Sequence, residues 1–177
     1  VQGEKDFKVF ENAILSNPKI MNVAVSDHQV GYSTYRFPVT VDTTSYEARL
    51  IGVGKNYFET MGFRFSAGRS FDLDNASDQE EAVIVNQAFV DMVGMTDPLD
   101  RVVQVHEFKR RIVGVLENHV DFLYNDGSNN SEQPFVFYPS RPTDYKIASI
   151  QVNPEDRATV QQYLEKTWKQ IFPTKPF

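Results

Sequence analysis

The order of the segments constrains the fold most, because each end of the chain combines one amphipathic helix with one strand. Apolar residues recur at three- and four-residue spacing over residues 4–16, which predicts a helix, and residues 20–25 then read as a strand. Near the other end, residues 146–152 read as a strand and residues 153–171 as a helix. We therefore expect the two ends of the chain to pack together in one lobe.

Particular residues mark the ends and the buried faces of these two helices. Asn17 precedes Pro18 and should end the first helix, because a residue before proline avoids helical geometry. In the last helix we expect Asn153 to act as the N-cap and Pro154 to occupy the first helical position. The buried faces should carry two apolar stripes, formed by Phe7, Phe10 and Ile14 and by Val160, Leu164, Trp168 and Ile171.

A mixed block of short strands and short helices lies between the two ends. Strands are predicted at residues 37–41, 46–53, 82–85, 101–105, 110–116 and 135–138, and helices at residues 55–61 and 87–93. Residues 26–33 and 72–80 read as loops, and the Asn-, Ser- and Gly-rich residues 124–133 are predicted to be disordered. The predicted fold class is α+β in two lobes. Residues 1–52 plus 144–177 form the outer lobe, and residues 53–143 form an inserted mixed α/β lobe.

Charge and composition exclude several classes of partner. The 177 residues carry 18 Lys and Arg against 24 Asp and Glu, whereas nucleic acids and polybasic membrane contacts require clustered cations. Without any Cys, the chain can form neither a disulfide nor a thiolate metal site. No apolar run approaches the roughly 20 residues of a membrane helix. Because the chain starts at Val1 without a Met and stops just after Pro176, we expect it to be a piece of a longer protein.

The candidate catalytic groups do not form recognised patterns. His28, His106 and His119 lack metal-ligand spacing and are interpreted as surface or loop residues. Asp27 beside His28, or Asn118 beside His119, could contribute to a triad, but the chain has no Gly-x-Ser-x-Gly motif. Residues 52–55 (GVGK) resemble a phosphate-binding loop only faintly, because the hydroxyl residue that should follow the lysine is missing.

Two further clusters have ordinary structural interpretations. The acidic residues of segment 72–81 are interpreted as a solvated turn rather than a calcium site, because the spacing of a calcium loop is absent. An aromatic cluster is interpreted as core, with an interface as the alternative; it consists of Tyr57, Phe58, Phe63, Phe65 and Phe71. We therefore predict that the chain is not an enzyme and that it has no catalytic residues, no cofactor and no metal site.

Five short motifs follow one another through the middle block. They are residues 56–62 (NYFETMG), 67–71 (AGRSF), 81–86 (EAVIVN), 97–99 (DPL) and 111–115 (RIVGV). In this order they resemble the signature of MacB/FtsX-type permeases of ABC transporters, and residues 134–139 and the last helix continue the resemblance. Two departures concern local turns: Asp100-Arg101 replaces the family's Gly-Lys, and Asn118-His119-Val120 replaces an Asp-Phe-His.

The resemblance implies a periplasmic domain between the first two membrane helices of a permease, with a porter-like outer lobe next to the membrane. Both termini should then lie at one end, and the middle block should project away from them. The implied partners are a cytoplasmic ATPase subunit or domain, a second permease in a dimer, and a periplasmic protein. The implied function is to relay ATP-driven conformational change to cargo export, lipoprotein release or a periplasmic partner.

Ten positions of the family motifs are predicted to be structural or interface residues. They are Tyr57, Phe58, Met61, Gly62, Gly68, Arg69, Asn86, Asp97, Pro98 and Gly114. Gly62 and Gly68 are expected to serve folding rather than cargo contact, through backbone conformations with positive φ. The alternatives are a stand-alone periplasmic binding or adaptor module and a hydrolase whose site residues are scattered along the sequence.

Overall fold

The computed structural model describes residues 4–29, 36–118 and 133–177. The helices are α1 (Glu4–Ile14), α2 (Tyr57–Thr60), α3 (Ala76–Glu81), α4 (Gln87–Val93) and α5 (Arg157–Ile171), with 3-10 turns η2 (Pro142–Asp144) and η3 (Pro154–Asp156). The strands are β1 (Ile20–Ser26), β2 (Phe37–Val41), β3 (Thr44–Val53), β4 (Phe65–Gly68), β5 (Ala82–Asn86), β6 (Val102–Val105), β7 (Phe108–Leu116), β8 (Phe135–Pro139) and β9 (Ile147–Val152). The mixed α and β content agrees with the predicted fold class.

Six of these strands form a closed ring, which we call the barrel. The ring runs β2-β6-β7-β5-β8-β3, and β3 pairs back to β2 along Phe37–Val41. Two of its pairings are parallel, β3 with β8 and β5 with β7, and the others are antiparallel. Its core is built from small branched side chains of the strands, with Phe89 and Val90 of α4 packed against them. Closure leaves these six strands with few open edges.

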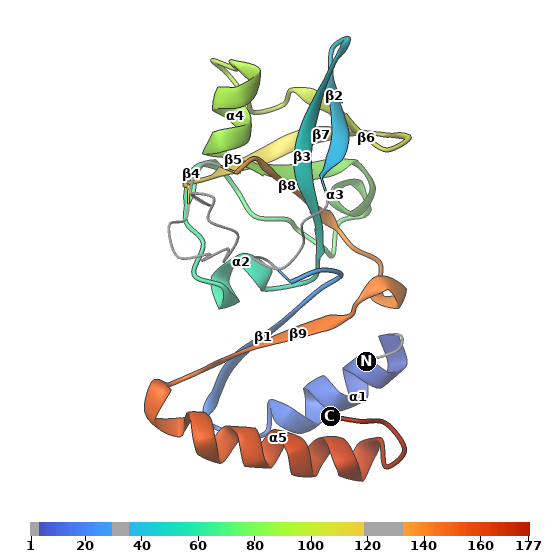
Figure 1. Ribbon diagram of the computed structural model, residues 1–177, viewed down its shortest axis with the longest axis vertical. Coiled ribbons are helices and arrows are strands. Elements are labelled where there is room, and N and C mark those ends of the chain that lie inside the picture. The colour runs from blue at the N-terminus through green and yellow to red at the C-terminus, as the bar shows by residue number, and fades with distance from the viewer. Residues whose placement is uncertain (1–3, 30–35, 119–132) are drawn as a thin grey trace.

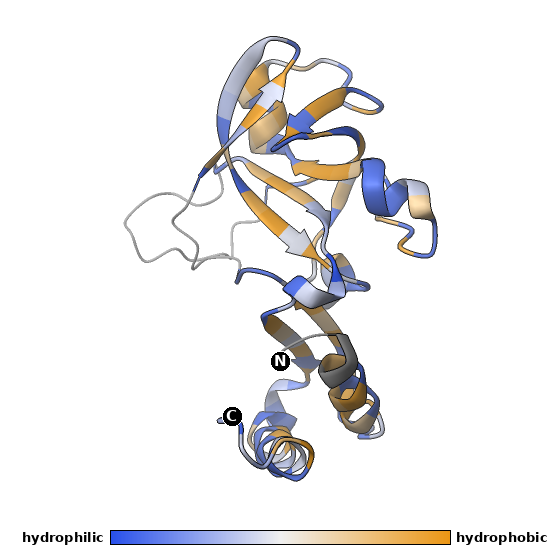
Figure 2. Ribbon diagram, turned by 90° about the vertical axis from the view of Figure 1, so that its right-hand side faces the viewer, coloured by the Kyte–Doolittle hydropathy of each residue, from blue (hydrophilic) through white to orange (hydrophobic). Residues whose placement is uncertain are grey.

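Strands β1 and β9 and the two long helices form a second layer, which we call the helix–strand unit. It consists of α1, β1, β9 and α5, and β1 pairs with β9 from Ile20 to Ser26. Strand β1 pairs with the barrel only at Ser26, opposite Val53 of β3. Figure 1 shows the barrel at one end of the molecule and the two helices side by side at the other. Figure 2 gives a second view, in which the barrel strands are mainly hydrophobic.

The two long helices run antiparallel. Near the end of α1, Tyr163 donates a hydrogen bond to the carbonyl of Ala13 over 2.9 Å. Earlier in α1, the rings of Phe10 and Trp168 meet edge to face, 5.2 Å apart. Contacts of later residues of α5 are made by earlier residues of α1, so the start of α1 and the end of α5 lie at the same end of the helix pair.

The strand pairing differs from the expected lobe assignment in one respect. The sequence analysis assigns β2 and most of β3 to the outer lobe, but these strands pair with β6 and β8 of the middle block. The physical reason is burial: Val39, Val41 and Leu50 fill the barrel core, and only the barrel offers them that interior. The division into two lobes stays a prediction, and this pairing places residues 37–53 with the barrel.

Two elements lie where the sequence analysis predicts neither a helix nor a strand. Strand β4, which was not predicted, pairs with β7. Helix α3 spans much of the acidic segment, so the loop predicted at residues 72–80 is wrong there. The last helix also begins differently, because η3 precedes α5 and the side chain of Asn153 makes no capping hydrogen bond. Residues 124–132, predicted to be disordered, and His119 lie outside the described residues.

Candidate functional site

The barrel and the helix–strand unit meet at a buried carboxylate, Asp27, immediately after β1. Its side chain accepts hydrogen bonds from the backbone N–H of Gly52 over 2.8 Å and from the hydroxyl of Tyr138 over 2.7 Å. Its own N–H donates to the carbonyl of Gly52 over 2.9 Å. On its other side, His28 Nδ1 lies 3.0 Å from Asp27 Oδ1. One charge therefore links β1, β3 and β8, and it is stable in the interior because donors surround it.

Glycine is required where β3 crosses this junction. A Cβ on Gly52 would lie 2.6 Å from Asp27 Oδ2, and a Cβ on Gly54 would lie 2.4 Å from a methyl group of Val25. Gly54 also donates its N–H to the carbonyl of Val25 over 2.9 Å. The GVGK segment is therefore the crossing point of β1 and β3, where two backbones approach more closely than side chains would permit.

Two tyrosines beside Asp27 stay protonated and can act as donors. Burial raises the pKa of Tyr57 above its usual value, and the nearby charge of Asp27 raises it further. Burial also raises the pKa of Tyr138, and its hydrogen bond to Asp27 acts in the same direction. Because ionised Tyr138 would face an ionised carboxylate, the neutral hydroxyl is the form that fits the junction.

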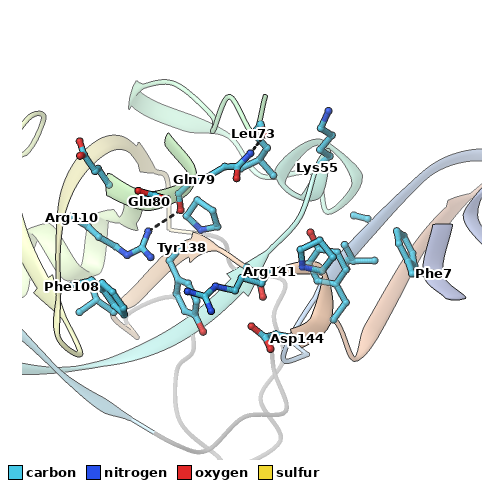
Figure 3. Close-up of a pocket in the computed structure, with 18 of the residues that line it drawn as sticks. Phe7, Lys55, Leu73, Gln79, Glu80, Phe108, Arg110, Tyr138, Arg141 and Asp144 are labelled. Carbon is cyan, nitrogen blue, oxygen red and sulfur yellow. Dashed lines mark hydrogen bonds between the residues drawn. The ribbon is translucent and has the colours of Figure 1, made fainter. Parts of the chain in front are cut away.

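A groove opens beside this junction, between the helix–strand unit and the barrel. Its volume is about 1160 Å³, and it is bounded by α1, β1, the β6–β7 turn and residues 138–145. Phe7 and Tyr145 meet edge to face at one end, with ring centroids 5.8 Å apart. Arg110 and Arg141 lie toward the other end, beside Tyr138 (Figure 3). The groove thus has an aromatic end and a cationic part.

The predicted motif residues of the middle block lie in several places rather than in one pocket. Tyr57 and Phe58 of α2 are buried in an aromatic cluster with Phe63 and Phe137, and Met61 packs against it. Gly62 ends α2 with a φ of 72°, as expected for a helix C-terminus. These residues support the barrel wall that carries β8.

A second group of motif residues brings β4 close to β7. Gly68 has a φ of 73°, and a Cβ there would lie 2.2 Å from the carbonyl oxygen of Val113. Gly114 faces it, and a Cβ on Gly114 would lie 2.4 Å from the carbonyl oxygen of Arg69. Arg69 Nη2 donates to Asp78 Oδ1 over 2.9 Å, and this bond lowers the pKa of Asp78. The expectation of positive φ at Gly62 and Gly68 is confirmed.

Asn86 is apart from the other motif residues, at the end of β5, where its side chain caps α4. Its side-chain oxygen accepts from the N–H of Phe89 over 3.2 Å and from the N–H of Phe135 over 2.8 Å. Its side-chain nitrogen donates to the carbonyl of Gln133 over 2.8 Å. Asp97 is exposed and Pro98 half-buried in the turn before β6, where Arg101 donates its N–H to the carbonyl of Pro98 over 3.3 Å.

The structure corrects the interpretation of one acidic residue, Asp78, and shows where two of the histidines lie. Asp78 is not solvated as predicted, because it is 5% exposed and paired with Arg69. Within residues 4–29, 36–118 and 133–177, no three His, Cys, Asp or Glu side chains gather in a way that could hold a metal ion. His106 lies exposed at the β6–β7 turn with a φ of 55°, as the loop interpretation predicts. His28 is half-buried against Asp27.

Sequence reasoning missed the residues that build the junction and the groove. Asp27 and His28 are noted in the sequence only as weak triad candidates, and Tyr138, Arg110 and Arg141 not at all. One signal was present, since Asp27 directly follows a strongly apolar strand and a charge there requires partners. The partners themselves could not be read, because Gly52 and Tyr138 are remote in sequence.

Comparison with known proteins gives a consistent result. The sequence model of the MacB-like periplasmic core domain family matches residues 5–167. The macrolide export ATP-binding/permease protein MacB of Bartonella quintana is 28% identical over 123 residues, which are 68% of this chain and 17% of that protein. MacB 2 of Aeromonas hydrophila is 27% identical over 131 residues, 73% of this chain and 19% of its own. The chain thus spans about a fifth of the length of these relatives.

Solved structures share the fold. The periplasmic region of MacB from Actinobacillus actinomycetemcomitans has a TM-score of 0.68 at 15% identity, covering 97% of this chain and 74% of that one. The extracellular domain of the noncanonic ABC-type transporter YknZ from Gram-positive bacteria has a TM-score of 0.69 at 16% identity, covering 98% and 85%. In the part of the chain that the structure describes, no helix has the length and hydrophobicity to cross a membrane.

Proposed function

This chain belongs to the family of MacB-like periplasmic core domains, and from that premise we propose that it is the extracytoplasmic domain of an ABC transporter permease. In this proposal the chain relays ATP-driven movement of the membrane helices to cargo export, lipoprotein release or a periplasmic protein. Two relatives are named ATP-binding/permease proteins, which supports an ATPase subunit or domain as a partner. A second permease in a dimer and a periplasmic protein complete the proposed set of partners.

The observation that carries the proposal is the antiparallel pairing of α1 and α5. The pairing brings the start of α1 and the end of α5 to the same end of the helix pair, and this pair lies across the end of the molecule opposite the barrel (Figure 1). Two helices that leave toward one surface can both continue into a membrane. The side chains of Phe10, Ile14 and Trp168 are nearly fully buried between these helices and the strands, so the pair can move as one body.

The junction supplies a route by which such movement would reach the barrel. Strand β1 ends next to the barrel, where Asp27 bonds to Gly52 of β3. Just before β9 begins, Lys146 donates its N–H to the carbonyl of Ser26 over 3.0 Å. The chain therefore leaves the helix–strand unit after Ser26 and returns to it at Lys146, and these two points lie next to each other. A narrow double connection of this kind is typical of a hinge, since few residues need to change conformation.

We further propose that the chain catalyses no reaction itself. Several polar groups at the junction are engaged with one another: Asp27 accepts hydrogen bonds from Gly52 and Tyr138, and Ser26 donates to the carbonyl of His28 over 2.8 Å. A nucleophile with an adjacent base in an open cavity would argue for an enzyme instead. Ser140 lines the groove, but its hydroxyl is buried beside Gly52 and has no hydrogen-bond partner among the described residues, so no base activates it there.

The test is a pair of distance measurements in the full-length transporter. The chain contributes no native Cys, so two engineered Cys residues can carry spin labels. Lys8→Cys on α1 with Lys109→Cys on β7 spans the groove, because both residues line it. The control is Lys8→Cys with Lys169→Cys, which places both labels on the paired helices.

We expect ATP binding to shift the Lys8–Lys109 distance distribution and to leave the Lys8–Lys169 distribution unchanged. Identical Lys8–Lys109 distributions with and without ATP would show that no movement is relayed across the junction. A full-length protein without membrane helices on either side of this chain would contradict the permease assignment itself. In that case the chain is a stand-alone periplasmic binding or adaptor module.

A further inference from the structure

Two arginines in the groove lack a carboxylate partner. Elsewhere in the described parts of the chain, Arg64, Arg69, Arg101 and Arg111 each lie within 4.0 Å of an Asp or Glu oxygen. Among the described residues, Arg110 and Arg141 have no such partner, and both line the groove. Arg36 and Arg157 likewise have no ion pair with an Asp or Glu among the described residues, but they do not line the groove, whereas Arg110 and Arg141 lie in it together.

Arg110 is held in place by weak contacts that leave its charge uncompensated. Its Cζ lies 5.8 Å from the ring centroid of Phe108 and 5.9 Å from that of Tyr138, which are cation–π distances. Its Nη1 donates to the carbonyls of Gln79 and Ala82 over 3.4 and 3.3 Å, both long for such bonds. Burial lowers the pKa of Arg110, and the neighbouring charge of Arg141 lowers it further. A half-buried guanidinium beside a second one is a strained arrangement that an anion would relieve.

Acidic residues do line the groove, but they do not pair with these arginines. Glu80 is close enough to influence Arg110 electrostatically, and Asp144 influences Tyr138. Neither carboxylate lies within ion-pair distance of Arg110 or Arg141 among the described residues. Figure 3 shows Arg110, Tyr138 and Arg141 gathered together, with the Asp144 carboxylate below them.

Lys8, Glu11 and Lys55 also line the groove, but its other end carries an apolar surface. It is formed by Phe7 of α1, Val23 and Val25 of β1, and Tyr145, with Pro139 and Pro142 along the way. A volume of about 1160 Å³ is large enough for a small molecule that contacts both ends. A ligand that matches this surface carries an anionic group and an apolar chain or ring.

We propose that the groove binds a small anionic amphiphile, whose carboxylate or phosphate group lies between Arg110 and Arg141 and whose apolar part lies against Phe7 and Tyr145. The guanidinium planes offer paired donors to such a group. The inference uses only the groove of this chain and does not depend on its attachment to a transporter. Binding to the isolated chain can therefore succeed even if the proposed relay of movement fails.

The experiment is calorimetric titration of the chain with four probes: octanoate, octyl phosphate, octanol and inorganic phosphate. Octanoate or octyl phosphate should bind at least about tenfold more tightly than octanol or inorganic phosphate, because only they engage both ends of the groove. The better of the two identifies the headgroup. Equal binding of octanol and octanoate would overturn the proposal, as would equal binding of inorganic phosphate.

Matched arginine variants locate the site. Arg141→Gln removes an exposed side chain and should weaken octanoate binding roughly tenfold or more, because charge-assisted hydrogen bonds are lost. Arg110→Gln should do the same, and Arg110→Lys should retain part of the affinity. The control is Arg157→Gln, an exposed arginine on α5 away from the groove. If Arg110→Gln does not fold, Arg141→Gln decides alone, and unchanged binding by Arg141→Gln would overturn the proposal.

Discussion

The hydroxyl of Tyr138 donates a 2.7 Å hydrogen bond to the buried carboxylate of Asp27, and this contact joins β8 of the barrel to the end of β1. The two residues are 111 positions apart in sequence. Their contact lies where the chain passes between the barrel and the helix–strand unit, so it reports directly on how the two parts are held together.

Removing this hydrogen bond should destabilise the protein. Tyr138→Phe leaves Asp27 buried with one donor fewer, and we expect a loss of about 1.5–3 kcal/mol in the free energy of unfolding, as for hydrogen bonds to charged groups. Urea denaturation measures this loss. Tyr46→Phe is the control, because the half-buried Tyr46 makes no side-chain hydrogen bond that the described residues show. Equal effects of the two substitutions would contradict the role assigned to Tyr138.

Gly68 and Gly62 should differ in their tolerance of alanine, although both have positive φ. Gly62→Ala adds a Cβ that meets nothing within 4 Å, so we expect only the conformational cost of about 1 kcal/mol. Gly68→Ala adds a Cβ 2.2 Å from the carbonyl oxygen of Val113, which forces β4 away from β7. Thermal unfolding should rank Gly68→Ala as clearly less stable, and the opposite ranking would refute the close approach of the two strands.

Asn86 should be the more sensitive of two helix caps. Asn86→Ala removes acceptors for Phe89 and Phe135 as well as a donor to Gln133, and we expect a cost of at least about 2 kcal/mol. Asn75→Ala removes only the exposed cap of α3, a 3.0 Å bond from the N–H of Ser77, and should cost about 1 kcal/mol or less. Chemical denaturation of both variants checks the difference.

The Arg69–Asp78 pair should make stability depend on acid pH. Arg69 lowers the pKa of Asp78 in the folded state, so the pair contributes stability above the unfolded pKa and loses it as pH falls through the folded pKa. We expect the free energy of unfolding to drop below about pH 4 in the wild type and less steeply in Asp78→Asn. Arg69→Gln should flatten the profile in the same way. Parallel profiles for all three proteins would rule out the pair as the cause.

Trp168 is a selective reporter of the helix–strand unit, because it is the chain's single Trp and packs against Phe10 and Phe172. Phe10→Ala should cost about 3–5 kcal/mol locally, as for other large-to-small core changes. If the unit and the barrel are separate lobes, Trp fluorescence should then report unfolding at lower urea than circular dichroism of the barrel strands. Coincident transitions in Phe10→Ala would argue against the two-lobe division.

Much of the local secondary structure could be predicted from the sequence, because the residues that mark the ends of helices and strands lie next to them in the chain. The helix at residues 87–93 lies between a capping Asn86 and a closing Gly94, and both signals act within one helical turn. The strands predicted at residues 101–105 and 110–116 correspond to β6 and β7, which pair with each other across a short turn. By contrast, β4 was missed because four residues around Ala67 carry little pattern, and only pairing with β7 makes them a strand.

Local sequence was enough to establish the α+β class, the amphipathic faces of the two terminal helices, the glycines at positive φ and the family resemblance, because each is encoded in short segments that can be read one after another along the chain. Tertiary structure alone decided that β2 and β3 close the barrel, that Asp27 is buried against Tyr138, and that Arg110 and Arg141 share a groove with Phe7. These relationships depend on contacts between segments that can be more than a hundred residues apart. Many such pairings bury similar apolar area, so local pattern cannot rank them, and the choice depends on how the whole core packs.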